Sequence, residues 1–146
     1  VFALINFGAL AVGSFFTGKG VPSEWYAELN KAPWTPPGWV FGGAWTTIMI
    51  CFSFYLAYLW PLVESKALLV GLFTIQLILN IGWNPVFFHL HQMGFGLIVI
   101  SLLTLVVGLF LILYWSKLKF TSLLIAPYLI WLIIATSLNA FAWLKN

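Results

Sequence analysis

The chain has 146 residues, of which 63% are hydrophobic, 19% aromatic and 6% charged. Soluble domains carry about 25% charged residues, so a mean hydropathy of +1.07 argues against a soluble enzyme, a nucleic-acid-binding protein and a disordered chain. The net charge of +3 arises from six Lys and three Glu, and the lysines form no basic patch. The single cysteine, Cys51, permits no intrachain disulfide and no zinc site of thiolate ligands. The composition is that of a membrane protein.

The membrane spans are predicted from the gaps between charged residues, because each helix needs about 20 uncharged residues to cross the bilayer. Four gaps occur, at 1–18, 32–63, 67–116 and 120–144, and a polar stretch at 89–94 divides the third into two spans. The sequence therefore predicts an all-α fold. It is a single domain over 1–146, a bundle of five transmembrane helices at about 1–16, 39–60, 67–88, 95–115 and 121–144.

The first predicted span is short and the chain begins with Val1, so we expect further residues to precede it in the full protein. A cleaved signal peptide is the alternative, although no charged segment and no clear cleavage site accompany the span. The orientation stays open, because the lysines divide three against three between the two sides of the membrane.

The loop at about 18–38 is the one long connection that the sequence predicts, and four prolines interrupt it. Ser23 is a candidate N-cap for a short helix over 24–30, on which Trp25, Tyr26 and Leu29 share one face. This helix is predicted to lie as a lid over the mouth of the bundle. An interfacial helix resting on lipid headgroups is the alternative.

Charged residues are absent from the predicted spans, which argues against an ion-coupled transporter, a charge-selective channel and acid–base catalysis. His89 and His91 are two residues apart and therefore do not share a helix face. We expect them in a loop or at the interface, with haem ligation by either as the alternative. No metal site is predicted.

Tryptophan is the most informative residue type, with nine in the chain. Five lie near the ends of predicted spans, where an aromatic belt at the membrane interface is expected: Trp34, Trp39, Trp60, Trp115 and Trp143. Three lie inside predicted helices instead: Trp45, Trp83 and Trp131.

Two predicted helices carry amides and aromatics at helical spacing. One face has Gln76, Asn80, Trp83 and Phe87, and the other has Tyr128, Trp131, Ala135 and Asn139. Lipid penalises amides, so both faces are predicted to point into the bundle. Pro85 and Pro127 are expected to kink their helices around a cavity. The amides would then line this cavity; the alternative is that they only form hydrogen bonds that hold the helices together.

Three segments together resemble the translocator protein family, also called TspO or tryptophan-rich sensory proteins. The first comprises Trp25-Tyr26, Lys31-Ala-Pro-Trp34-Thr-Pro-Pro-Gly-Trp39-Val-Phe and Ala44-Trp45-Thr46. The second is Gln76-Leu-x-x-Asn80-x-x-Trp83-x-Pro85-x-Phe87-Phe88 with Gln92-Met93. The third is Pro127-Tyr128-Leu129-x-Trp131 with Ala135-Thr136-x-Leu138-Asn139. The segments occur in family order, and the resemblance covers the whole chain.

The resemblance implies a five-helix membrane bundle that binds porphyrins, such as protoporphyrin IX and haem, and synthetic aromatic ligands below the first loop. No cofactor is required. Matching positions imply that the pocket is lined by Tyr26, Trp34, Trp45, Asn80, Trp83, Phe87, Trp131, Ala135 and Leu138. Its indoles would stack on a tetrapyrrole, and Lys19 or Lys31 would reach the propionates. Lysines that only extend towards the membrane surface are the alternative.

Three functions follow from the resemblance. The first is a porphyrin-binding receptor or sensor that handles or regulates tetrapyrroles. The second is light-dependent porphyrin degradation, with Trp45 and Trp131 as catalytic residues. The third is a passive carrier of porphyrin or lipid.

The partners and the location are predicted as follows. Membrane lipid surrounds the chain, in a bacterial cell membrane or, in a eukaryote, the mitochondrial outer membrane. A homodimer is suggested by small residues four apart, at Ala9 and Gly13, Gly38 and Gly42, and Ala67 and Gly71. Cholesterol is weakly supported, because Phe141 replaces the tyrosine of the animal sterol motif and Lys145 is its basic residue.

Overall fold

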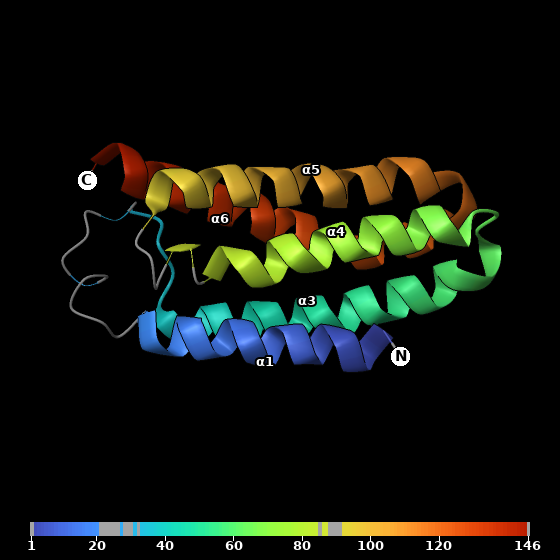
Figure 1. The fold of residues 1–146 in the computed structure, drawn as a ribbon, viewed down its shortest axis with the longest axis horizontal. Helices are drawn as coiled ribbons and strands as arrows, with labels where there is room; N and C mark the ends of the chain where they lie inside the picture. The colour runs from blue at the N-terminus through green and yellow to red at the C-terminus, as the bar shows by residue number, and fades with distance from the viewer. Residues whose placement is uncertain are drawn as a thin grey trace.

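Long α-helices make up the described part of the protein in a computed structural model (Figure 1). The structure describes residues 2–20, 27, 31, 33–84, 86–87 and 92–145. The α-helices are α1 (Phe2–Gly20), α3 (Gly38–Leu59), α4 (Lys66–Asn84), α5 (Met93–Leu118) and α6 (Ala126–Lys145). Two 3-10 segments accompany them: η1 (Trp60–Leu62) follows α3, and η3 (Lys119–Ile125) joins α5 directly to α6.

Contacts between neighbouring helices close these elements into a ring. α1 contacts α3 and α4, α6 contacts α3 and α5, and α4 contacts α5, so the order around the ring is α1, α3, α6, α5, α4. In Figure 1 the end of α1, the start of α3 and the end of α6 lie at one end of the molecule, named the loop end because α1 ends and α3 begins there, and the α3–α4 connection lies at the other end. The bundle thus has a loop end and an opposite end.

Three segments are long and apolar enough to cross a membrane: Trp39–Leu62, Lys66–Trp83 and Met93–Lys145. The last contains both α5 and α6, and Phe2–Val12 in α1 is a shorter apolar helix. These helices confirm the prediction of an all-α membrane protein. The number of five membrane crossings stays a prediction.

Helix α5 illustrates how a helix that is apolar on every side is placed in this bundle. Its buried residues recur every three or four positions, which gives one stripe facing the other helices: Gly96, Ile100, Leu103, Val107, Phe110, Tyr114 and Leu118. Leu105 and Ile112 on the remaining surface are exposed and apolar. Packing against neighbours, rather than polarity, therefore decides which face of α5 is inside.

An aromatic cluster at the centre of the ring joins α3, α5 and α6. The Phe52 ring meets the rings of Tyr128 and Phe110 edge-on, at centroid distances of 5.2 and 5.8 Å. Tyr55 is fully buried and donates its hydroxyl hydrogen to the backbone carbonyl of Phe110 at 3.1 Å. Burial of these rings supplies packing that lipid contact alone does not give.

The two predicted classes of tryptophan are distinct in the structure. The tryptophans near span ends are all at least a third exposed: Trp34, Trp39, Trp60, Trp115 and Trp143. Trp45, Trp83 and Trp131 are 6–7% exposed. Burial therefore confirms the division into peripheral and interior indoles.

The predicted position of Pro127 in the interior of a helix is wrong. The sequence placed this proline inside a helix over 121–144, but α6 begins at Ala126 after the 3-10 segment η3. The carbonyl of Leu123, four residues before the proline, accepts a hydrogen bond from the Ala126 N–H. Because Pro127 is in the first turn of α6, its missing N–H leaves no helical bond unmade.

Other boundaries also differ from the predicted ranges. Helix α1 continues to Gly20, and α4 ends at Asn84, the residue before Pro85, where the helical conformation is disfavoured. Several predictions fall on residues outside the described part of the chain. They are the short helix over 24–30 with Tyr26, the kink at Pro85, and the loop placement of His89 and His91.

Candidate ligand-binding site

Buried amides and a tyrosine link α4 to α6 inside the ring. Asn80 donates from Nδ2 to the Tyr128 hydroxyl at 2.6 Å, and that hydroxyl donates to Gln76 Oε1 at 2.9 Å. All three residues are less than 10% exposed. The amide face of α4 therefore points into the bundle, as its spacing predicted, and the tyrosine on α6 satisfies both amides.

A second polar link lies nearer the loop end. The Trp83 indole donates to Asn139 Oδ1 at 3.0 Å, and Asn139 donates from Nδ2 to the backbone carbonyl of Met93 at 2.7 Å. Trp83 also stacks on Phe87, with ring centroids 5.3 Å apart and an interplanar angle of 22°. One side chain of α6 thus connects the end of α4 to the start of α5.

Gly96 makes room for this link. A Cβ added at Gly96 would lie 3.1 Å from Asn139 Oδ1 and 3.7 Å from the Trp83 and Phe87 side chains. Asn139 is held by its two hydrogen bonds, so it has little freedom to retreat. A glycine is therefore needed here for close packing rather than for an unusual backbone angle.

We expect Gly96→Ala to lower the free energy of unfolding by about 1 kcal/mol, because the new methyl group displaces a hydrogen-bonded amide. Gly108→Ala on the same helix is the matched control, because nothing lies within 4 Å of a Cβ there. That control should be neutral or stabilising by about 0.5 kcal/mol. Equal unfolding free energies of the two variants in mixed micelles would contradict the packing role of Gly96.

The interior tryptophans of α3 and α6 lie close to aromatic partners. Trp45 meets Tyr128 edge-on at a centroid distance of 6.0 Å, and Trp131 meets Phe41 edge-on at 5.5 Å. Ala135 is 3% exposed and follows Trp131 by one helical turn. Leu138 is half-buried and packs against the core.

Trp34 occupies a different environment from the other candidate residues. It is 53% exposed and belongs to the connection before α3. Its indole donates to Ser137 Oγ at 3.0 Å and its ring meets Phe141 edge-on at 5.6 Å. These contacts attach the connection to the last turns of α6.

The structure thus brings most candidate residues to the loop-side half of the bundle, on facing surfaces of α3, α4 and α6. Tyr26 lies outside the described residues. The sequence did not predict a role for Gly96 or Phe41, because each contributes through a contact with a residue on another helix: Gly96 with Asn139, and Phe41 with Trp131. The only sequence signal for Gly96 is a small residue in a run of large apolar ones.

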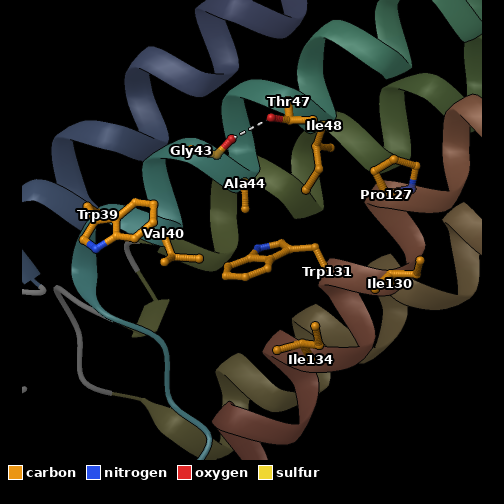
Figure 2. A pocket seen from close by; sticks show the side chains of 10 residues that line it. All are labelled: Trp39, Val40, Gly43, Ala44, Thr47, Ile48, Pro127, Ile130, Trp131 and Ile134. Carbon is orange, nitrogen blue, oxygen red and sulfur yellow. Dashed lines mark hydrogen bonds between the residues drawn. The ribbon is translucent and has the colours of Figure 1, made fainter.

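A groove between α3 and α6 opens beside Trp131 (Figure 2). Its volume is about 330 Å³, and its walls include Val40 and Ala44 of α3 and Ile130 and Ile134 of α6. A second apolar groove, of about 430 Å³, lies between α1 and α3. The interior aromatic cluster is therefore flanked by apolar hollows between neighbouring helices.

Metal coordination has no basis in the described part of the chain, where no group of three or more His, Cys, Asp or Glu side chains could hold an ion. The polar groups of the site are instead amides, a phenol and indoles. Such groups orient a flat aromatic ligand through stacking and hydrogen bonds rather than through charge.

Comparison with known proteins gives matches along nearly the whole chain. A model of the TspO/MBR family matches residues 1–144. Protein CrtK of Rhodobacter capsulatus is 36% identical over 139 residues, which are 93% of this chain and 84% of that protein. Translocator protein of Homo sapiens is 32% identical over 145 residues, 97% of this chain and 85% of that protein. Tryptophan-rich protein TspO of Chlorobaculum tepidum is 39% identical over 132 residues, 87% and 82% of the two chains.

Proposed function

Because this chain belongs to the TspO/MBR family and is a multi-pass integral membrane protein, we propose that it is a membrane receptor for porphyrins. Protoporphyrin IX, haem and related aromatic or lipid ligands would bind among the interior tryptophans. The protein would act in handling or regulating tetrapyrroles, and no cofactor is required.

The observation that supports this proposal is the pair of facing aromatic and amide surfaces on α4 and α6. The indoles of Trp83 and Trp131 are buried, and Asn80, one turn before Trp83, bonds Tyr128, one turn before Trp131. A tetrapyrrole is flat and apolar over its ring but carries two propionates. The ring would lie against the indoles, and the propionates would lie at the loop, where Lys31 belongs.

A fluorescence titration with protoporphyrin IX tests the proposal. Saturable quenching of the intact protein is expected, with affinity reduced about tenfold, or about 1.4 kcal/mol, in the double variant Trp45→Phe, Trp131→Phe. Trp60→Phe, Trp115→Phe is the matched control, because it also removes two indoles but at the opposite end of the bundle. Equal affinities of the two double variants would contradict binding at the proposed site.

Trp34 gives a kinetic prediction for the same site. Trp34→Ala removes the hydrogen bond to Ser137 and the edge contact with Phe141. Because these contacts hold the loop connection on α6, porphyrin dissociation should accelerate about fivefold, which corresponds to about 1 kcal/mol. Trp34→Phe keeps a ring but no donor, so an intermediate rate is expected in stopped-flow displacement. Identical rates for all three proteins would show that this connection does not retain ligand.

Light-dependent porphyrin breakdown is a second candidate function. The observation that favours it is the burial of two oxidisable indoles, those of Trp45 and Trp131, at the proposed porphyrin site. A passive carrier would instead be recognised by porphyrin movement between vesicles without chemical loss. Bleaching rates and transfer rates therefore separate these functions from simple binding.

A further inference from the structure

The groove between α3 and α6 has walls made of hydrocarbon side chains with few polar atoms. Val40, Ala44 and Ile48 form one wall, and Pro127, Ile130 and Ile134 form the other. Figure 2 shows the Trp131 ring reaching from α6 across the floor towards α3. The Thr47 hydroxyl at the rim is already used, because it donates to the Gly43 carbonyl at 2.9 Å.

One polar hydrogen in this groove lacks an acceptor. Trp131 is 7% exposed, and its Nε1 is buried without a hydrogen-bond partner among the residues that the structure describes. In Figure 2 this nitrogen lies on the ring edge drawn towards Ala44, which lines the same groove. Buried donors are nearly always paired in native proteins, so this indole N–H indicates an acceptor that comes from outside the chain.

The depth of Trp131 restricts the source of that acceptor. The residue lies near the middle of the apolar stretch between Lys119 and Lys145, which comprises the 3-10 segment η3 and most of α6. Water, phosphate and the ester carbonyls of phospholipids are concentrated at the interface, outside the hydrocarbon core. An acceptor that reaches Trp131 from within the hydrocarbon core therefore belongs to a molecule that dissolves in the core, whereas an acceptor from the interface would have to enter past Trp39 at the start of α3.

We propose that this groove is a second binding site, for a lipophilic ketone or quinone whose carbonyl oxygen accepts the Trp131 indole hydrogen. Its chain or ring fills the apolar hollow between α3 and α6. The molecule enters sideways from the bilayer, because the groove faces lipid. This site goes beyond the proposed porphyrin site and does not require porphyrin binding.

The indole hydrogens can be observed directly by NMR of protein labelled with ¹⁵N-tryptophan in lipid nanodiscs. Trp131→Phe identifies the Trp131 signal among the nine tryptophans of the chain. The probes are a symmetrical long-chain ketone and the alkane of equal length. We expect a saturable downfield shift of the Trp131 indole proton with the ketone and no comparable shift with the alkane.

Two neighbouring glycines of α3 provide a matched pair of variants. Gly43 lines the groove and Gly42 does not. A Cβ at either position meets nothing within 4 Å, and both residues are exposed, so a leucine side chain can extend outwards and both variants should fold. Gly43→Leu fills the hollow and should weaken the ketone response at least about tenfold, whereas Gly42→Leu should leave it unchanged. Equal responses of the two variants would overturn the assignment of the site.

Three further outcomes would also overturn the proposal. The first is an equal shift with ketone and alkane, which would mean simple filling of the groove. The second is an Nε1 signal that is already hydrogen-bonded in ester-linked lipid but not in ether-linked lipid, which would identify a phospholipid carbonyl as the occupant. The third is a response to protoporphyrin IX but not to the ketone, which would make the groove part of the porphyrin site. Loss of porphyrin binding alone would leave the ketone response, and hence this proposal, intact.

Discussion

Replacing Asn139 with leucine should lower the free energy of unfolding by about 3 kcal/mol, the largest stability effect expected for a single substitution in this site. Leucine has a similar volume, so packing is largely kept while the hydrogen bonds to Trp83 and to the Met93 carbonyl are lost. Each loss withdraws a partner from a polar group in a water-free interior. Single interhelical hydrogen bonds in model membrane helices contribute less free energy, but the Asn139 side chain forms hydrogen bonds to two other helices, α4 and α5.

Thr136→Val is the matched control for this substitution. Thr136 is on the same helix, half-buried, and its hydroxyl is 3.3 Å from that of Thr104 on α5. That contact is long and Thr104 also bonds the Ile100 carbonyl, so the control should lose less than about 1 kcal/mol. Reversible unfolding in mixed micelles measures both. Similar losses for Asn139→Leu and Thr136→Val would show that the Asn139 link is not a principal tie between α4, α5 and α6.

The inward faces of α4 and α6 could be predicted from sequence because amides are costly in lipid. Gln76, Asn80 and Asn139 had to be buried wherever the helices lay, and helical spacing placed the aromatics beside them. The division of the tryptophans into peripheral and interior ones could be predicted as well, because the distance along the chain from the nearest Lys or Glu indicates depth in the membrane.

The pairing of those polar groups could not be predicted. Spacing along one helix does not determine its rotation against another, so nothing in the sequence indicated that Tyr128 lies between the two amides. The 3-10 segment before α6 was missed for a related reason. Residues 120–125 are mostly apolar, and an apolar run fits 3-10 and α-helical backbone equally well.

The groove beside Trp131 likewise depends on how α3 and α6 pack against each other. Gly43 and Ala44 on α3 are small where a large ring projects from α6, and this leaves the hollow open. In the sequence Gly43 is indistinguishable from Gly42, which does not line the groove. Which small residue makes a cavity is therefore decided by tertiary packing.

Trp131→Phe should retain much of the porphyrin affinity but lose most of the light-dependent decrease in the porphyrin Soret band. Phenylalanine keeps an aromatic ring against Phe41 and fills much of the volume of the indole. Indole gives an electron to a photoexcited porphyrin at contact distance, leaving an oxidised indole and a porphyrin reduced by one electron, which dioxygen then attacks. Because benzene rings are far harder to oxidise, this first step should slow by at least about tenfold, equivalent to only about 1.4 kcal/mol in its barrier.

The measurement is the rate of Soret loss under constant illumination, with the porphyrin bound to saturation in every variant. Trp45→Phe should behave as Trp131→Phe does if both interior indoles are required, whereas Trp60→Phe at the opposite end should bleach as the unchanged protein does. Saturation matters because it separates reactivity from affinity. If Trp131→Phe bleaches bound porphyrin at the unchanged rate, the indole is not the electron donor. The site then binds porphyrin without degrading it by this route.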